Sequence, residues 1–172
     1  MEEWLNHFSQ LAQDNVTLAY IFLFLSAYIE NVFPPIPGDT VTLIGAYFVG
    51  RGKLSYPGVL ISTTIGSVAG FMTLFLLAYW LEWKVIEKRH FSWIQKSHID
   101  RVQAWFRKYG FAIILFNRFL SGVRSVISVT AGLSKLSVRK VFWLSTIGAV
   151  IWNGLIIFAG AAIGKNWQEI LH

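Results

Sequence analysis

Residues 54–81 read LSYPGVLISTTIGSVAGFMTLFLLAYWL, and these 28 positions carry no charged side chain. A second uncharged segment, VFWLSTIGAVIWNGLIIFAGAAIG, covers the 24 positions 141–164. A helix needs about 20 apolar residues to cross a bilayer, and both segments exceed that length. No segment shows the dyad alternation of a membrane β-barrel strand. We therefore expect an all-α polytopic membrane protein with crossing helices over 54–81 and 138–164.

The composition supports this class. Of 172 residues, 55% are hydrophobic and 14% are charged, against roughly 25% charged residues in an ordinary soluble domain. The 15 Lys and Arg outnumber the 9 acids, but they cluster beside apolar segments, which favours contact with anionic lipid over nucleic acid. There is no cysteine, and the four histidines show no metal-ligand spacing, so we expect no metal and no other cofactor. We expect one membrane domain over 1–172.

Two further apolar segments, 16–50 and 109–134, are interrupted by charges and by helix-breaking residues. Proline and glycine end a helix, so each segment predicts a re-entrant helical hairpin. Such a turn is tolerated at membrane depth only where it is buried in protein or lines a water-filled cavity. The hairpin-forming residues are Pro34, Pro35, Pro37, Gly38, Ser121 and Gly122.

The remaining segments are amphipathic. Residues 1–14 predict an interfacial helix, and residues 82–108 predict a surface linker rich in basic and aromatic side chains. The positive-inside rule then places this linker in the cytoplasm and both termini outside.

The chain also contains an internal repeat. A shift of 82 residues gives eight identities in the sixteen positions 53–68, including Lys-Leu-Ser and Thr-Ile-Gly in both copies. If each hairpin returns to its own side and the next helix crosses once, the second copy is inverted relative to the first. We expect two inverted-topology repeats. Four glycines are expected to allow close helix packing: Gly66, Gly70, Gly148 and Gly154.

Four charges fall within the interrupted segments: Glu30, Asp39, Arg118 and Arg124. Facing lipid, each would cost about 2.5–3.5 kcal/mol, so we expect all four to point inward and to meet where the hairpins dock. Two structural alternatives stay open. The charges could form ion pairs that only hold the hairpins together, or Glu30 could snorkel to the interface.

On the functional interpretation, Arg118 and Arg124 bind a phosphate group, because a guanidinium matches phosphate oxygens bidentately. Glu30 and Asp39 are the proton-coupling candidates, since burial and a nearby arginine act on a carboxylate's pKa in opposite directions. Three asparagines are possible cavity-lining residues: Asn31, Asn117 and Asn153. Asn153, beside Trp152 in the last crossing helix, could instead bond across helices, which we favour.

Two motifs remain, FPPIPGD at 33–39 with Glu30 just before it, and RFLSGVR at 118–124 running into Ala131-Gly132. In these motifs the chain resembles the DedA family, whose members carry the SNARE-associated, or VTT, domain. The resemblance covers residues 16–165 and implies inner-membrane proteins with two opposed re-entrant hairpins. It also implies that some members recycle undecaprenyl phosphate or other phospholipids with the proton motive force. The family's acidic and arginine positions correspond here to Glu30, Asp39, Arg118 and Arg124. Many relatives have proline where Ser121 stands and near Thr130, so the second hairpin is expected to bend differently.

Together these features predict a lipid flippase of the inner (plasma) membrane, not an enzyme, acting on undecaprenyl phosphate, with other phospholipids as the next substrates. Its expected partners are membrane lipids and protons, with a homo-oligomer also conceivable. Three rivals remain. A proton-coupled ion transporter would need the carboxylates, and a phosphatase would need a nucleophile such as an intramembrane histidine, which neither hairpin contains. A purely structural protein would function without the charges.

Overall fold

The computed structural model describes residues 15–33, 38–81, 104, 106, 108–109, 111–119 and 123–170, and all regular structure within them is helical. This confirms the all-α prediction. The interfacial helix expected at 1–14 lies outside the described residues, as does nearly all of the linker expected at 82–108. The elements are α2 (Val16–Val32), α3 (Gly38–Gly50), α4 (Tyr56–Trp80), α7 (Ala112–Phe116), the 3-10 helix η1 (Asn117–Phe119), α8 (Arg124–Leu133) and α9 (Val138–Ile170).

Two helices, α4 and α9, are long and apolar enough to cross a membrane by length and composition. The Ser55 side chain caps α4 by accepting a hydrogen bond from the Gly58 amide, and Pro57 lies in the first turn, where its missing N–H is not needed. On α9, the large side chains of Trp143, Leu155 and Phe158 point outward and are more than half exposed. An apolar surface of this kind suits a hydrocarbon environment and would be unfavourable in water.

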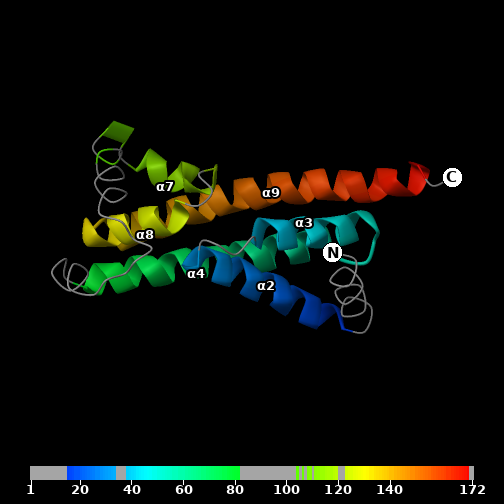
Figure 1. Ribbon diagram of the computed structural model, residues 1–172, viewed down its shortest axis with the longest axis horizontal. Coiled ribbons are helices and arrows are strands. Elements are labelled where there is room, and N and C mark those ends of the chain that lie inside the picture. Colours follow the sequence, from blue (N-terminus) through cyan, green and yellow to red (C-terminus); the bar gives the residue numbers. More distant parts are fainter. Residues whose placement is uncertain are drawn as a thin grey trace.

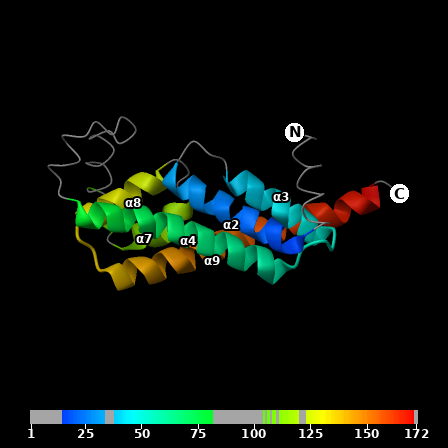
Figure 2. The same cartoon turned by 90° about the horizontal axis from the view of Figure 1, so that it is seen from below.

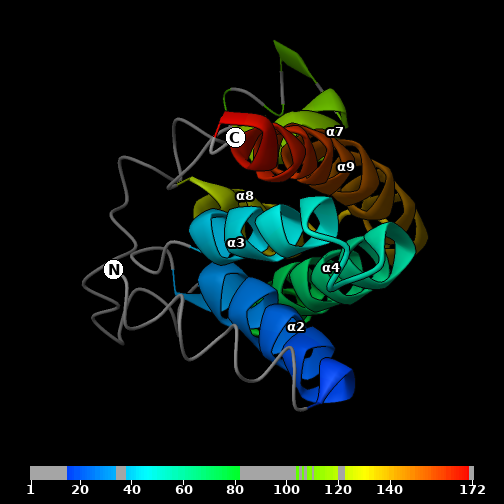
Figure 3. The ribbon, with the colours of Figure 1, turned by 90° about the vertical axis from the view of Figure 1, so that its right-hand side faces the viewer.

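The shorter helices form two pairs at opposite ends of the bundle (Figure 1): the first pair is α2 with α3, and the second is α7 and η1 with α8. Each pair contacts both long helices. In the first pair, α2 packs on α4 and α3 packs on α9, whereas in the second pair α7 packs on α9 and α8 packs on α4. Figure 2 shows α2 lying along α4, and the end-on view in Figure 3 shows α3 and α8 near the centre of the bundle. The inner ends of the two pairs therefore face each other between the long helices.

Glycines allow these close contacts. A Cβ atom at Gly66 of α4 would collide with the carbonyl oxygen of Phe24 in α2, and one at Gly148 of α9 would collide with that of Leu115 in α7. These two glycines are aligned by the 82-residue shift, and each receives the first helix of a pair. Gly70 likewise lies against the α2 backbone. The prediction of close packing was wrong for Gly154, because a Cβ atom there would meet the Tyr56 hydroxyl at 3.7 Å, which is an ordinary contact.

Candidate functional site

Charged side chains from both pairs meet where the inner ends of the pairs face each other. Arg124, the first residue of α8, donates from Nη1 to Oε1 of Glu30 in α2, at 2.9 Å. Its Nη2 donates to Oδ2 of Asp39, in the first turn of α3, where the helix N-terminus favours a negative charge. One guanidinium thus bridges carboxylates from two helices. The Glu30 side chain is only 10% exposed, so Glu30 is a largely buried ion-pair partner.

The second arginine, Arg118, is placed very differently. It lies in η1 and is 3% exposed, and none of the described residues accepts a hydrogen bond from its Nη1. Within the described part of the chain, no carboxylate forms a salt bridge with it, although the charges of Glu30 and Asp39 lie within electrostatic range. A buried cation without a partner is costly. The geometry around Arg118 therefore suits an anion or water that neutralises or solvates it.

Uncharged polar groups surround these four charges, which we call the charged junction (Glu30, Asp39, Arg118 and Arg124). Ser125 donates to the Asn31 carbonyl at 3.0 Å and Ser128 donates to the Phe71 carbonyl at 2.6 Å, which fixes α8 against α2 and α4. Several buried side-chain atoms on α2, η1 and α8 lack a hydrogen-bond partner among the described residues, and all but the Thr130 atom belong to a junction arginine or to a direct sequence neighbour of a junction residue. Buried polar atoms are normally satisfied by protein or ordered water, so the atoms at the junction indicate a hydrated or ligand-binding space. The atoms without such a partner are Asn31 Oδ1, Asn117 Oδ1, Arg118 Nη1, Arg124 Nε and Thr130 Oγ1.

Helix α9 also reaches the charged junction, through Trp152. The indole Nε1 donates to Oδ1 of Asp39 at 3.2 Å, and the ring meets Phe119 of η1 edge-on, with the centroids 4.9 Å apart. Composition and periodicity did not reveal this role of Trp152. The available signal was its position inside an apolar helix, whereas most other tryptophans flank the apolar segments. The neighbouring Asn153 donates to Thr64 Oγ1 at 3.3 Å. Asn153 therefore forms the hydrogen bond between helices that the sequence favoured over a cavity-lining role.

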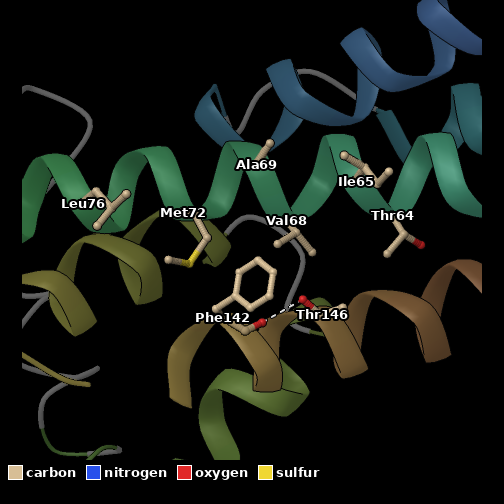
Figure 4. Close-up of a pocket in the computed structure, with 8 residues that line it drawn as sticks. All are labelled: Thr64, Ile65, Val68, Ala69, Met72, Leu76, Phe142 and Thr146. Carbon is tan, nitrogen blue, oxygen red and sulfur yellow. Dashed lines mark hydrogen bonds between the residues drawn. The ribbon is translucent and has the colours of Figure 1, made fainter. Parts of the chain in front are cut away.

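An apolar pocket of about 390 Å³ lies between α4 and α9 (Figure 4). Its two hydroxyl groups are already engaged, because Thr146 donates to the Phe142 carbonyl and Thr64 accepts from Asn153. The pocket therefore presents mainly methyl groups, a thioether and a phenyl ring to its interior. The residues lining this α4–α9 pocket are Thr64, Ile65, Val68, Ala69, Met72, Leu76, Phe142 and Thr146.

The structure thus brings Glu30, Asp39 and Arg124 into direct contact and places Arg118 beside them. Asn31 and Asn117 adjoin the charged junction through their neighbours in sequence, while Asn153 links α9 to α4. Gly38 begins α3. The other expected turn residues lie outside the described residues: Pro34, Pro35, Pro37, Ser121 and Gly122. In the part of the chain that the structure describes, no cluster of three or more His, Asp or Glu could hold a metal ion.

Comparison with known proteins identifies relatives along most of the chain. The VTT domain family matches residues 36–162. An alkaline phosphatase-like protein of Lactococcus lactis subsp. lactis is 36% identical over 83% of this chain and 69% of its own length. Undecaprenyl phosphate transporter A of Bacillus subtilis is 27% identical over 78% of this chain and 69% of its own length.

A third relative, inner membrane protein YqjA of Escherichia coli, is 24% identical over 95% of this chain and 76% of its own length. No solved structure matches the chain. The family match spans well over half of the sequence and includes Asp39, Arg118 and Arg124. The chain therefore belongs to the VTT-domain, or DedA, family of membrane proteins.

Proposed function

We propose that this protein moves a phosphate-bearing lipid, in the first place undecaprenyl phosphate, across the inner membrane. One observation carries the proposal: the buried Arg118 guanidinium, whose Nη1 has no hydrogen-bond partner among the described residues, lies beside a second arginine that two carboxylates already hold. A phosphate oxygen is the acceptor that such a group binds best. The name of the Bacillus relative, undecaprenyl phosphate transporter A, supports the same substrate class.

In this proposal the two helix pairs are re-entrant hairpins of an inverted repeat, and their inner ends meet near the midplane of the bilayer. Two observations support the repeat. The first helix of one pair packs on α4 and the first helix of the other packs on α9, and the second helices pack the other way round. Gly66 and Gly148, which the 82-residue shift aligns, each contact the first helix of a pair. Transporters built from inverted repeats bind substrate at this depth, between broken helices. The charged junction would then be accessible from either side as the two hairpins move.

Glu30 and Asp39 would couple this movement to protons. Both carboxylates hold Arg124 in the structure, so protonating one of them would weaken that hold. Arg124 could then join Arg118 on the phosphate, and deprotonation would reverse the step. The proton motive force would thereby drive the cycle in one direction.

The α4–α9 pocket would accommodate part of the hydrocarbon chain of the same lipid. Both helices that line it are long and apolar enough to cross the membrane, and its interior offers no free polar group. Its Thr64 end is tied to Asn153, whose neighbour Trp152 contacts Asp39. The pocket and the charged junction are thus connected through α9.

The test uses purified protein in liposomes that contain a fluorescent polyprenyl phosphate, with a quencher added outside. We expect the wild type to accelerate exposure of the inner-leaflet lipid and a pH gradient to increase the rate. Arg118→Gln should abolish the acceleration, whereas Arg139→Gln, which alters an exposed arginine at the start of α9, should not. Equal rates for Arg118→Gln and the wild type would refute the proposal. Proton flux without any lipid movement would favour an ion transporter.

A further inference from the structure

Trp152 contacts the charged junction from a helix that carries none of its four residues. It lies on α9 and has a donor-only side chain, whereas the four charged groups come from α2, α3, η1 and α8. Its indole N–H and the Arg124 Nη2 approach different oxygens of the Asp39 carboxylate. Asp39 therefore has a donor on each oxygen, and its orientation is fixed from two sides.

This orientation matters because Asp39 has a second cation nearby. Asp39 is the least buried of the three ion-paired side chains, at 29% exposure, and its charge acts on Arg118 as well. An aspartate released from Trp152 could rotate toward Arg118, whose Nη1 has no partner among the described residues. The carboxylate would then form an ion pair with the Arg118 guanidinium, which a phosphate needs for binding.

The contact between Trp152 and Phe119 acts on the same element. Phe119 directly follows Arg118 in η1, and its ring meets the indole edge-on. Trp152 therefore contacts the carboxylate that could compete for Arg118 and also the short helix that carries Arg118. We propose that Trp152 is a positioning residue that keeps Asp39 on Arg124 and so reserves Arg118 for the phosphate group of the substrate. This inference rests on the proposed function.

Binding of a soluble phosphorylated isoprenoid, geranyl phosphate, to the detergent-solubilised protein tests the inference by titration calorimetry. Trp152→Phe keeps the ring and removes the donor, and we expect its Kd to rise about tenfold, the loss typical of a charge-assisted hydrogen bond. Trp152→His keeps an aromatic N–H and should recover part of the affinity. Trp80→Phe, at an exposed position at the end of α4, serves as the matched control and should bind like the wild type.

The decisive comparison uses a second background. In Asp39→Asn the competing charge is absent, so adding Trp152→Phe should leave the Kd for geranyl phosphate unchanged. A purely structural tryptophan would weaken binding equally in both backgrounds, and that result would overturn the proposal, as would unchanged binding by Trp152→Phe alone. If the wild type and Arg118→Gln bind the probe equally, the proposed function itself fails. The two failures are therefore distinguishable.

Discussion

The charged junction and the α4–α9 pocket both adjoin α9, yet their polar groups differ in hydrogen bonding. At the charged junction, several buried polar atoms lack a partner among the described residues, and two of them belong to arginine side chains. In the pocket, both hydroxyl groups are already hydrogen-bonded and the rest of the lining is apolar. An unsatisfied donor requires an acceptor, whereas a satisfied apolar wall can gain only from hydrocarbon. The difference indicates separate places for the head group and the chain of one amphipathic ligand.

The largest effect is expected at Arg124. Arg124→Ala removes the cation that pairs with both Glu30 and Asp39 and leaves the two carboxylates close together, so the free energy of unfolding should fall by about 3–5 kcal/mol. Denaturant unfolding in detergent measures this loss, with Arg139→Ala as the exposed control. In a Glu30→Gln, Asp39→Asn background the same substitution should cost much less, because the three groups are coupled. Additive losses would show that the ion pairs do not stabilise the fold together.

Arg118 should show the reverse pattern. Arg118→Met removes a buried charge that has no ion-pair partner within the described part of the chain and keeps an apolar stem, so the free energy of unfolding should stay equal or rise. Lipid transport should nevertheless fall at least about tenfold, since one charged hydrogen bond of roughly 1.5–3 kcal/mol is lost. Paired unfolding and liposome measurements on the same preparation would check this. A variant that loses stability and activity in parallel would mean that Arg118 is structural.

A smaller effect is expected at Ser128, which joins α8 to α4 close to the charged junction. Ser128→Ala removes its hydrogen bond to the Phe71 carbonyl and should lower the free energy of unfolding by about 1 kcal/mol. Phosphate binding should remain as in the wild type, because the Ser128 hydroxyl is hydrogen-bonded to the α4 backbone. An altered Kd for geranyl phosphate would extend the binding site along α8.

The smallest effect is expected in the pocket. Ala69→Leu fills part of its volume, and Ala162→Leu adds the same bulk at an exposed position on α9. Transport of a long-chain polyprenyl phosphate should slow by roughly two- to fivefold in Ala69→Leu. This corresponds to the loss of about one buried methylene group of the lipid chain from the pocket. Binding of geranyl phosphate should change less than transport of the long-chain lipid. If both substrates are affected equally, the pocket does not distinguish chain from head group.

Sequence patterns predicted the helical class and the meeting of opposite charges, because both follow from the cost of charge and of free backbone groups in hydrocarbon. They did not distinguish Arg118 from Arg124. The two arginines lie six residues apart in similar surroundings, and only the three-dimensional arrangement shows that Arg124 takes both carboxylates. Trp152 was missed for a related reason. Its partner Asp39 is 113 positions away, in α3. Helix α3 packs mainly on α9, whereas its neighbour α2 packs on α4, and sequence periodicity does not reveal this arrangement.

The packing of α3 on α9, a helix that is synthesised much later, affects how the chain assembles during synthesis. Helix α3 packs mainly on α9, and a Cβ atom at Gly50 would collide with the α9 backbone at Ala161. When the amino-terminal half first leaves the ribosome, α2 and α3 can pack on each other and on α4, but the surface of α3 that faces α9 has no counterpart until translation is almost finished. A membrane insertase or chaperone that shields α3 during this interval would raise the yield, and a premature stop before α9 would leave an intermediate prone to degradation.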